Sequence, residues 1–139
     1  SMIAIKAIAI KKFKKNPRLE EFIFNEISVL KKINNINVIK FYDQLKTENY
    51  AYYIYEYCNE GTLDDLITKD TYLKEKKAYY FFRQILNGCK ALIENNILHR
   101  DIKPANILIH NNMIKIADFG FCKKKNSLYN MNITMVGSP

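Results

Sequence analysis

Two short motifs in the C-terminal third constrain this 139-residue sequence more than any other feature. The first is the run His99-Arg100-Asp101-Ile102-Lys103-Pro104-Ala105-Asn106, and the second, Asp118-Phe119-Gly120, begins twelve residues after it. Each motif alone is compatible with an ordinary loop or turn. In this order, and joined by a predicted β-hairpin, they are typical of a site that positions reacting groups.

The side chains of these motifs fit the demands of phosphoryl transfer, which depends on positioning and charge neutralisation more than on covalent catalysis. The Asp101 carboxylate can accept the proton of an attacking hydroxyl. Asn106 and Asp118 offer hard oxygen ligands suited to Mg²⁺. Lys103 can reach a transferred phosphate as a point charge. The sequence therefore predicts two catalytic residues, Asp101 and Lys103, and two metal ligands, Asn106 and Asp118.

Hydrophobic periodicity predicts strands and one helix first, and mainly helical structure afterwards. The predicted strands are residues 3–10, 38–45 and 50–57. The predicted helices are residues 19–33, opened by Pro17, residues 62–68, capped by Thr62, and residues 73–95. A hairpin of residues 106–110 and 113–117 is expected to turn at Asn111-Asn112. Such segregated elements favour an α+β fold with two lobes and a hinge at residues 56–61.

The two motifs resemble the eukaryotic protein kinase family. Residues 99–106 match the catalytic-loop pattern H-R-D-L-x-x-x-N with Ile102 in place of leucine. A lysine two residues after the aspartate, here Lys103, resembles the pattern of the serine/threonine branch. The resemblance implies an incomplete, bilobal α+β kinase domain over residues 1–139. Its N-lobe part is 2–57, its hinge 58–61 and its C-lobe part 62–139. The implied activity is transfer of the ATP γ-phosphoryl group to a protein hydroxyl, with ATP and Mg²⁺ as cofactors.

The resemblance extends to the strand Ile3-Ala4-Ile5-Lys6, which is similar to the family's V-A-I-K motif. It implies that Lys6 holds the α- and β-phosphates and that Glu26 is its ion-pair partner. Glu26 falls in the apolar stripe of the predicted helix, where a buried charge needs a partner. An ordinary surface glutamate is the alternative.

The aromatic strand before the hinge resembles the family's adenine-binding segment. By that match Tyr55 is the gatekeeper, and the Glu56 carbonyl and the Cys58 amide bond the adenine edge. Ala4 and Leu108 would enclose the adenine ring between them. Ordinary core packing is the alternative for these two side chains, and both roles can hold together.

His99 is predicted to have a structural role. The resemblance places it in a stack similar to the family's regulatory spine, with Leu30, Phe41 and Phe119. We therefore expect His99 to be packed in the interior, and we do not expect it to act as a base.

The end of the chain resembles the autophagy-initiating serine/threonine kinase group, on the stretches Lys115 to Phe121 and Thr134 to Pro139. Thr134 is the predicted phosphosite, because related kinases are often phosphorylated at this place in the activation loop. A phosphate there would pair with Arg100 and order the loop. An unmodified loop threonine is the alternative.

The formal net charge of +8 has two interpretations. It reflects a solvated basic surface, or it attracts an anionic partner such as a nucleotide, an acidic protein or a membrane surface. The basic runs do not interleave with aromatic side chains on one helix face, so nucleic acid is not favoured as a partner. Three cysteines without C-x-x-C spacing argue against zinc and favour the cytoplasm, with the nucleus as alternative. No apolar run is long enough to span a membrane.

Two other classes of function stay open beside the kinase. One is an inactive kinase fragment or pseudokinase that acts as a scaffold, because neither a G-x-G-x-x-G-x-V loop nor an A-P-E motif is present in the sequence. The other is a basic nucleic-acid binder. A chain of this extent is expected to expose an apolar patch on the predicted helix 73–95. The expected partners are a protein substrate and a regulatory subunit or upstream kinase.

Overall fold

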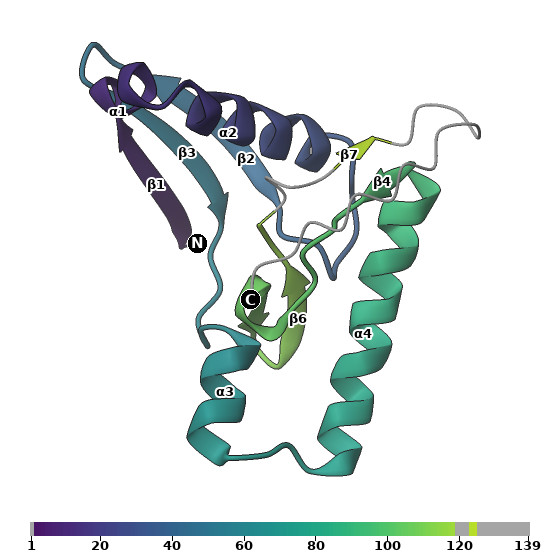
Figure 1. Ribbon diagram of the computed structural model, residues 1–139. Coiled ribbons are helices and arrows are strands. Elements are labelled where there is room, and N and C mark those ends of the chain that lie inside the picture. The colour runs from purple at the N-terminus through teal and green to yellow at the C-terminus, as the bar shows by residue number, and fades with distance from the viewer. Residues whose placement is uncertain (1, 119–122, 125–139) are drawn as a thin grey trace.

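The computed structural model of the chain describes residues 2–118 and 123–124. A three-stranded sheet with helices beside it forms the N-terminal part, and two helices with a hairpin of short strands form the C-terminal part (Figure 1). This arrangement confirms the predicted α+β fold. In chain order the elements are β1 (Ile3–Ala9), α1 (Ile10–Lys15), α2 (Pro17–Leu30), β2 (Phe41–Lys46), β3 (Tyr50–Glu56), α3 (Leu63–Asp70), α4 (Glu75–Glu94), β4 (Ile97–Leu98), the 3-10 helix η1 (Pro104–Asn106), β5 (Ile107–His110), β6 (Met113–Ile116) and β7 (Lys123–Lys124).

The sheet has the strand order β1-β3-β2, with β3 antiparallel to both neighbours. A tight turn joins β2 to β3, and in it the Thr47 backbone N–H donates to the Tyr50 carbonyl at 2.8 Å. The strands predicted at residues 38–45 and 50–57 are therefore present as an antiparallel pair, although β2 starts at Phe41 rather than at Val38. Val38 and Ile39 instead pack beside β6, where the Ile39 N–H donates to the Ile116 carbonyl at 2.9 Å.

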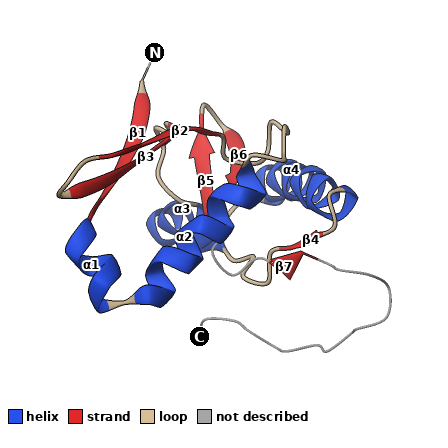
Figure 2. Cartoon of the chain, turned by 90° about the horizontal axis from the view of Figure 1, so that it is seen from above, coloured by secondary structure: helices blue, strands red, loops and turns tan. Residues whose placement is uncertain are grey.

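Helix α2 begins at Pro17, as predicted, because proline at the first helical position has no N–H to leave unsatisfied. Its buried residues Ile23 and Ile27 pack in one cluster with Ala51 and Tyr53 of β3. The preceding helix α1 was not predicted. At six residues it is too short to give a clear helical period, and its first residue continues the β-branched run of β1. Figure 2 shows α1 leading from the end of β1 into α2.

Local side-chain chemistry accounts for two boundaries in the C-terminal part. Thr62 caps α3 in a reciprocal capping box: the Asp65 N–H donates to Thr62 Oγ1, and the Thr62 N–H donates to the Asp65 carboxylate, both at 3.0 Å. Hydrogen bonding from the Thr62 backbone N–H and from the Thr62 side chain lowers the pKa of the Asp65 carboxyl. Asn111 and Asn112 turn the β5–β6 hairpin with φ of 47° and 63°, a left-handed conformation that asparagine tolerates well. The predicted cap and the predicted turn are both confirmed.

The largest core cluster lies where the two parts of the chain meet. It joins α2, the segment before β2, α4 and β6, and its members are Val29, Leu30, Ile33, Val38, Ile39, Leu92, Ile97 and Ile116. Helix α4 approaches this core closely through Gly88, since a Cβ there would lie 2.7 Å from Ile116 Cδ1 and 2.9 Å from the Asn37 carbonyl oxygen. The junction therefore depends on a helix position without a side chain.

The apolar side chains of α4 are only partly buried. Phe81 and Leu92 lie in the core, whereas Phe82, Leu86 and Ile93 are each more than half exposed. The apolar patch expected on this helix is therefore present. No helix within the described residues is both long and apolar enough to cross a lipid bilayer.

Replacing Gly88 by alanine tests the close contact between α4 and β6. Alanine has the better helix propensity by about 1 kcal/mol, but the new methyl group would displace Ile116 and the Asn37 backbone. We expect Gly88→Ala to lower the free energy of unfolding by about 1–3 kcal/mol in urea denaturation. Lys76→Ala, at an exposed position of the same helix, is the matched control. A Gly88→Ala protein as stable as the unaltered one would contradict this packing.

Candidate active site

The loop between β4 and β5 brings three of the predicted site residues together. Asp101 and Asn106 are buried, with 8% and 9% of their surface exposed. The Asn106 side-chain amide donates to the Asp101 backbone carbonyl and to Asp101 Oδ2, both at 2.9 Å. The Lys103 ammonium lies 3.9 Å from Asp101 Oδ1. The turn of η1 reverses the chain between these residues, so that Asn106 reaches back to Asp101.

This arrangement fixes the direction of the Asp101 carboxylate. One of its oxygens accepts a hydrogen bond from Asn106, and the other faces Lys103. A carboxylate held in this way can accept a proton from a hydroxyl that approaches it, and the neighbouring ammonium can stabilise negative charge that develops beside it. The predicted catalytic pair Asp101 and Lys103 is therefore adjacent in space.

His99 supports this loop from the interior. It is 4% exposed, its Nδ1 accepts a hydrogen bond from the Asp101 N–H at 3.1 Å, and its Nε2 lies 2.8 Å from the Ala117 carbonyl oxygen. These partners assign the proton to Nε2, which donates to Ala117. Burial lowers the pKa of His99, and the bond to Ala117 and the nearby carboxylates oppose this shift. His99 is packed, as predicted, and Leu30 and Phe41 of the predicted stack share one cluster.

The end of β6 is tied to the same loop. The Ala117 N–H donates to the Asn106 carbonyl at 3.0 Å, so Ala117 is bonded to both His99 and Asn106. Asp118 follows directly, with an exposed side chain and φ of 58°, a conformation that non-glycine residues adopt rarely. The two predicted metal ligands, Asn106 and Asp118, are therefore carried by segments that are hydrogen-bonded side by side.

The donor set fits Mg²⁺. Asn106 uses its side-chain nitrogen to bond Asp101, and its Oδ1 receives no hydrogen bond from the described residues. Together with the exposed Asp118 carboxylate it offers hard oxygen ligands, and Mg²⁺ commonly completes such a site with phosphate oxygens and water. No cluster of three or more His, Cys, Asp or Glu side chains that suits a metal ion occurs in the described part of the chain.

The predicted ion pair between Lys6 and Glu26 is absent from the structure. Glu26 is 8% exposed, and Tyr55 donates its hydroxyl to Glu26 Oε1 at 2.6 Å. Lys6 is exposed on β1, opposite Tyr53 in the sheet, and the ion pairs among the described residues do not include it. The prediction failed because the hydroxyl of Tyr55 on the central strand supplies the partner that the buried carboxylate needs. Burial, together with Glu26, raises the pKa of Tyr55 above the usual range of a phenol.

The residues predicted to surround adenine lie on both sides of the hinge. Ala4 of β1 pairs with Tyr55 of β3, which places them next to each other in the sheet. Leu108 of β5 is half-buried and forms an isolated bridge with Thr62, just after the hinge. Glu56 ends β3, and Cys58 lies two residues further on.

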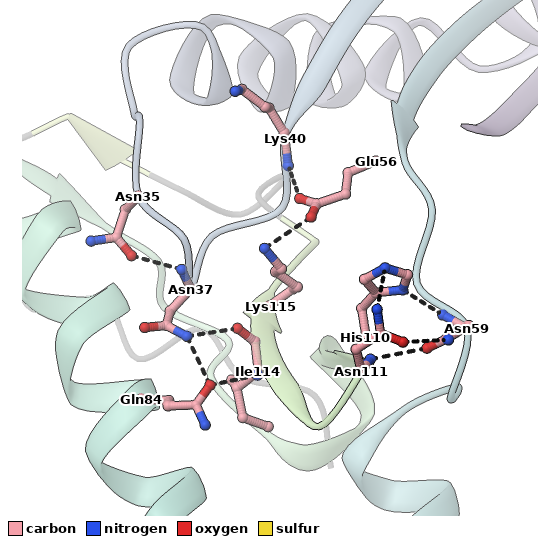
Figure 3. Close-up of polar contacts among 10 residues, drawn as sticks. All are labelled: Asn35, Asn37, Lys40, Glu56, Asn59, Gln84, His110, Asn111, Ile114 and Lys115. Atoms are coloured by element: carbon pink, nitrogen blue, oxygen red, sulfur yellow. Dashed lines mark hydrogen bonds and ion pairs between the residues drawn. The ribbon is translucent and has the colours of Figure 1, made fainter. Parts of the chain in front are cut away.

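Two features of this region were missed in the sequence. Lys115 forms an ion pair with Glu56 at 2.8 Å, with 8% and 19% of the two side chains exposed (Figure 3). Asn37, which is 3% exposed, donates to Gln84 of α4 and to the Ile114 carbonyl, both at 3.0 Å (Figure 3). The available signal was a lysine inside the apolar strand Met113–Ile116, since a buried charge requires a partner.

The hinge is fastened to the turn of the β5–β6 hairpin. The Asn59 side-chain amide donates to Asn111 Oδ1 at 2.9 Å, and the Asn111 backbone N–H donates to Asn59 Oδ1 at 3.1 Å (Figure 3). The Asn59 N–H also donates to His110 Nδ1 at 3.2 Å. The Glu60 N–H donates to the Ile109 carbonyl at 3.0 Å. Thr134 and Phe119, which were also predicted to have roles, lie outside the described residues.

Comparisons with known proteins agree with this geometry. The sequence profile of the protein kinase domain family matches residues 1–139. The serine/threonine-protein kinase ATG1c of Arabidopsis thaliana is 36% identical over 99% of this chain and 19% of its own length. The serine/threonine-protein kinase atg1 of Dictyostelium discoideum is 37% identical over 90% of this chain and 20% of its own length. The serine/threonine-protein kinase shk1/pak1 of Schizosaccharomyces pombe is 38% identical over 96% of this chain and 20% of its own length.

The α+β fold is that of a protein kinase domain, and the chain belongs to the protein kinase domain family. Its relatives include serine/threonine kinases of the ATG1 type, in agreement with the predicted resemblance to the autophagy-initiating group. The chain spans about a fifth of the length of these relatives.

The bond between Tyr55 and Glu26 can be tested by removing one hydroxyl. Tyr55→Phe leaves a buried carboxylate without its hydrogen-bond donor. We expect the free energy of unfolding to fall by about 1–3 kcal/mol in urea denaturation. Tyr52→Phe is the control, because the Tyr52 hydroxyl bonds none of the described residues. If Tyr55→Phe lowers the free energy of unfolding no more than this control does, the Tyr55 hydroxyl is not what stabilises the buried Glu26 carboxylate.

The lowered pKa of His99 predicts a pH dependence of stability. The unfolded chain takes up a proton near the ordinary imidazole pKa of 6.5, whereas the folded chain resists protonation until a lower pH. The stability that neutral His99 provides is thus complete above pH 6.5 and is lost as the pH falls through the folded pKa. We expect His99→Gln to flatten this decline in urea titrations at a series of pH values. An equally steep decline in the variant would rule out His99 as its source.

Proposed function

We propose that the protein carrying this chain is a serine/threonine protein kinase that transfers the γ-phosphoryl group of ATP to a protein hydroxyl. The observation that carries the proposal is the joint placement of Asp101, Asn106 and Lys103 in one hydrogen-bonded loop. Membership of the protein kinase domain family and the similarity to serine/threonine kinases support it.

In the proposed reaction Asp101 orients the hydroxyl of the protein substrate and accepts its proton. Its fixed carboxylate suits this role, because Asn106 prevents it from turning away. Lys103 stabilises the charge on the phosphoryl group as it moves between the two oxygens. Asn106 and Asp118 would hold Mg²⁺, which neutralises the phosphate charge when it is bound.

The nucleotide would lie between the two parts of the chain. The Glu56 carbonyl and the Cys58 N–H would bond the adenine edge, with Ala4 and Leu108 on the two faces of the ring and Tyr55 behind it. Lys6 would contact the phosphates. It would do so without Glu26 as its ion-pair partner, since Glu26 is bonded to Tyr55 in this structure. Free thiols at Cys58 and Cys89 accord with a cytoplasmic or nuclear location.

A catalytically inactive scaffold is the second candidate function. The observation that favours it is the bond between Glu26 and Tyr55, which occupies the carboxylate expected to pair with Lys6. The two candidates differ in one measurable property, the transfer of phosphate.

Replacing the carboxylate of Asp101 or of Asp118 tests the proposed kinase activity. In the full-length protein we expect Asp101→Asn and Asp118→Asn each to lower transfer of labelled γ-phosphate to a generic serine/threonine substrate by about a hundredfold or more. Asp64→Asn, on the exposed face of α3, is the control and should retain full activity. An unaltered protein that binds ATP·Mg²⁺ but transfers no phosphate would favour the scaffold. Full activity in Asp101→Asn would refute the assigned base.

A further inference from the structure

Lys115 is a buried lysine that the proposed reaction does not use. It is the third residue of β6, and its ammonium lies 2.8 Å from Glu56 Oε1. The other oxygen, Glu56 Oε2, accepts a hydrogen bond from the Lys40 N–H at 3.2 Å, and the Glu56 N–H donates to the Lys40 carbonyl at 2.8 Å. The end of β3 is therefore held from two directions, by the segment before β2 and by β6 (Figure 3).

This ion pair lies beside the other residues predicted to bind adenine. Lys115 is directly opposite Leu108 in the β5–β6 ladder. Burial raises the pKa of the Cys58 thiol to about 11, with Glu56 adding to the shift and Lys115 opposing it, so both charges act on this residue. Lys115 thus connects the two residues whose backbone would bond the adenine edge with the residue that would cover its face.

The ammonium of Lys115 is not available as a phosphate ligand. The side chain is 8% exposed, and its partner among the described residues is Glu56. Any effect of Lys115 on a nucleotide must therefore pass through the position of Glu56. The Glu56 side chain is only 19% exposed. Without the ammonium its carboxylate would be largely desolvated and without its charge partner, and it would turn toward water and draw the end of β3 with it.

We propose that Lys115 is a positioning residue of the adenine site, which holds the backbone from Glu56 to Cys58 at the correct distance from Leu108 through its ion pair with Glu56. The inference rests on the proposed function, since it assumes that this backbone bonds a nucleotide base. The residue sets the affinity for the base and takes no part in phosphate transfer.

The test measures binding of the adenine base separately from binding of the phosphates. Binding of adenosine and of inorganic tripolyphosphate with Mg²⁺ is measured by calorimetry on the full-length protein. We expect Lys115→Met to weaken adenosine binding about tenfold, the factor that corresponds to one misplaced hydrogen bond, and to leave tripolyphosphate binding unchanged. In steady-state kinetics the KM for ATP should rise about tenfold at an unchanged kcat.

Lys40→Met is the matched control. It removes an exposed lysine side chain beside the same carboxylate and keeps the backbone N–H that bonds Glu56, so neither affinity should change. Glu56→Gln breaks the charge pair from the other side and should weaken adenosine binding in the same direction. It replaces Lys115→Met as the deciding variant if the latter does not fold.

Two results would overturn the inference and leave the proposed function intact. One is unchanged adenosine binding in the folded variant, and the other is an equal loss of both ligands, which indicates a general structural defect. An unaltered protein that does not bind adenosine would instead overturn the proposed function, and the inference with it.

Discussion

The β5–β6 hairpin is the element on which both ends of the candidate site depend. Its first strand follows directly on Asn106, and its second strand ends just before Ala117 and Asp118. Its turn is bonded to the hinge through Asn59 and Asn111, and Lys115 pairs with Glu56. One short hairpin therefore connects the segment expected to bond adenine with the residues expected to bind magnesium, and a shift of the hairpin would displace both.

The core keeps this hairpin in place. Ile114 and Ile116 are completely buried, and Ile116 shares a cluster with residues of α2 and α4. Asn37 adds polar contacts, since it bonds both Gln84 of α4 and the backbone of Ile114. Because these contacts reach across the junction of the two parts, the geometry of the site is coupled to the packing between sheet and helices rather than to the loop alone.

The features that the sequence predicted well are those set by neighbouring residues. Thr62 and Asp65 form a capping box three residues apart, and Asn111-Asn112 suits a hairpin turn without help from distant residues. The failures involve distant partners. Tyr55 and Glu26 are 29 residues apart, and no periodicity indicates that a tyrosine takes the place expected for Lys6. The pair of Lys115 and Glu56 was missed for the same reason, although a lysine in an apolar strand pointed to a buried partner.

In the proposed site Asn106 and Asp118 bind one nucleotide-bound magnesium ion beside Asp101. A crystal structure of the full-length protein with Mg²⁺ and a non-hydrolysable ATP analogue tests it most directly. We expect a metal ion at about 2.1 Å from Asn106 Oδ1 and from a carboxylate oxygen of Asp118, with the γ-phosphate facing Asp101. A nucleotide bound elsewhere, or a metal ion held by other residues, would contradict it.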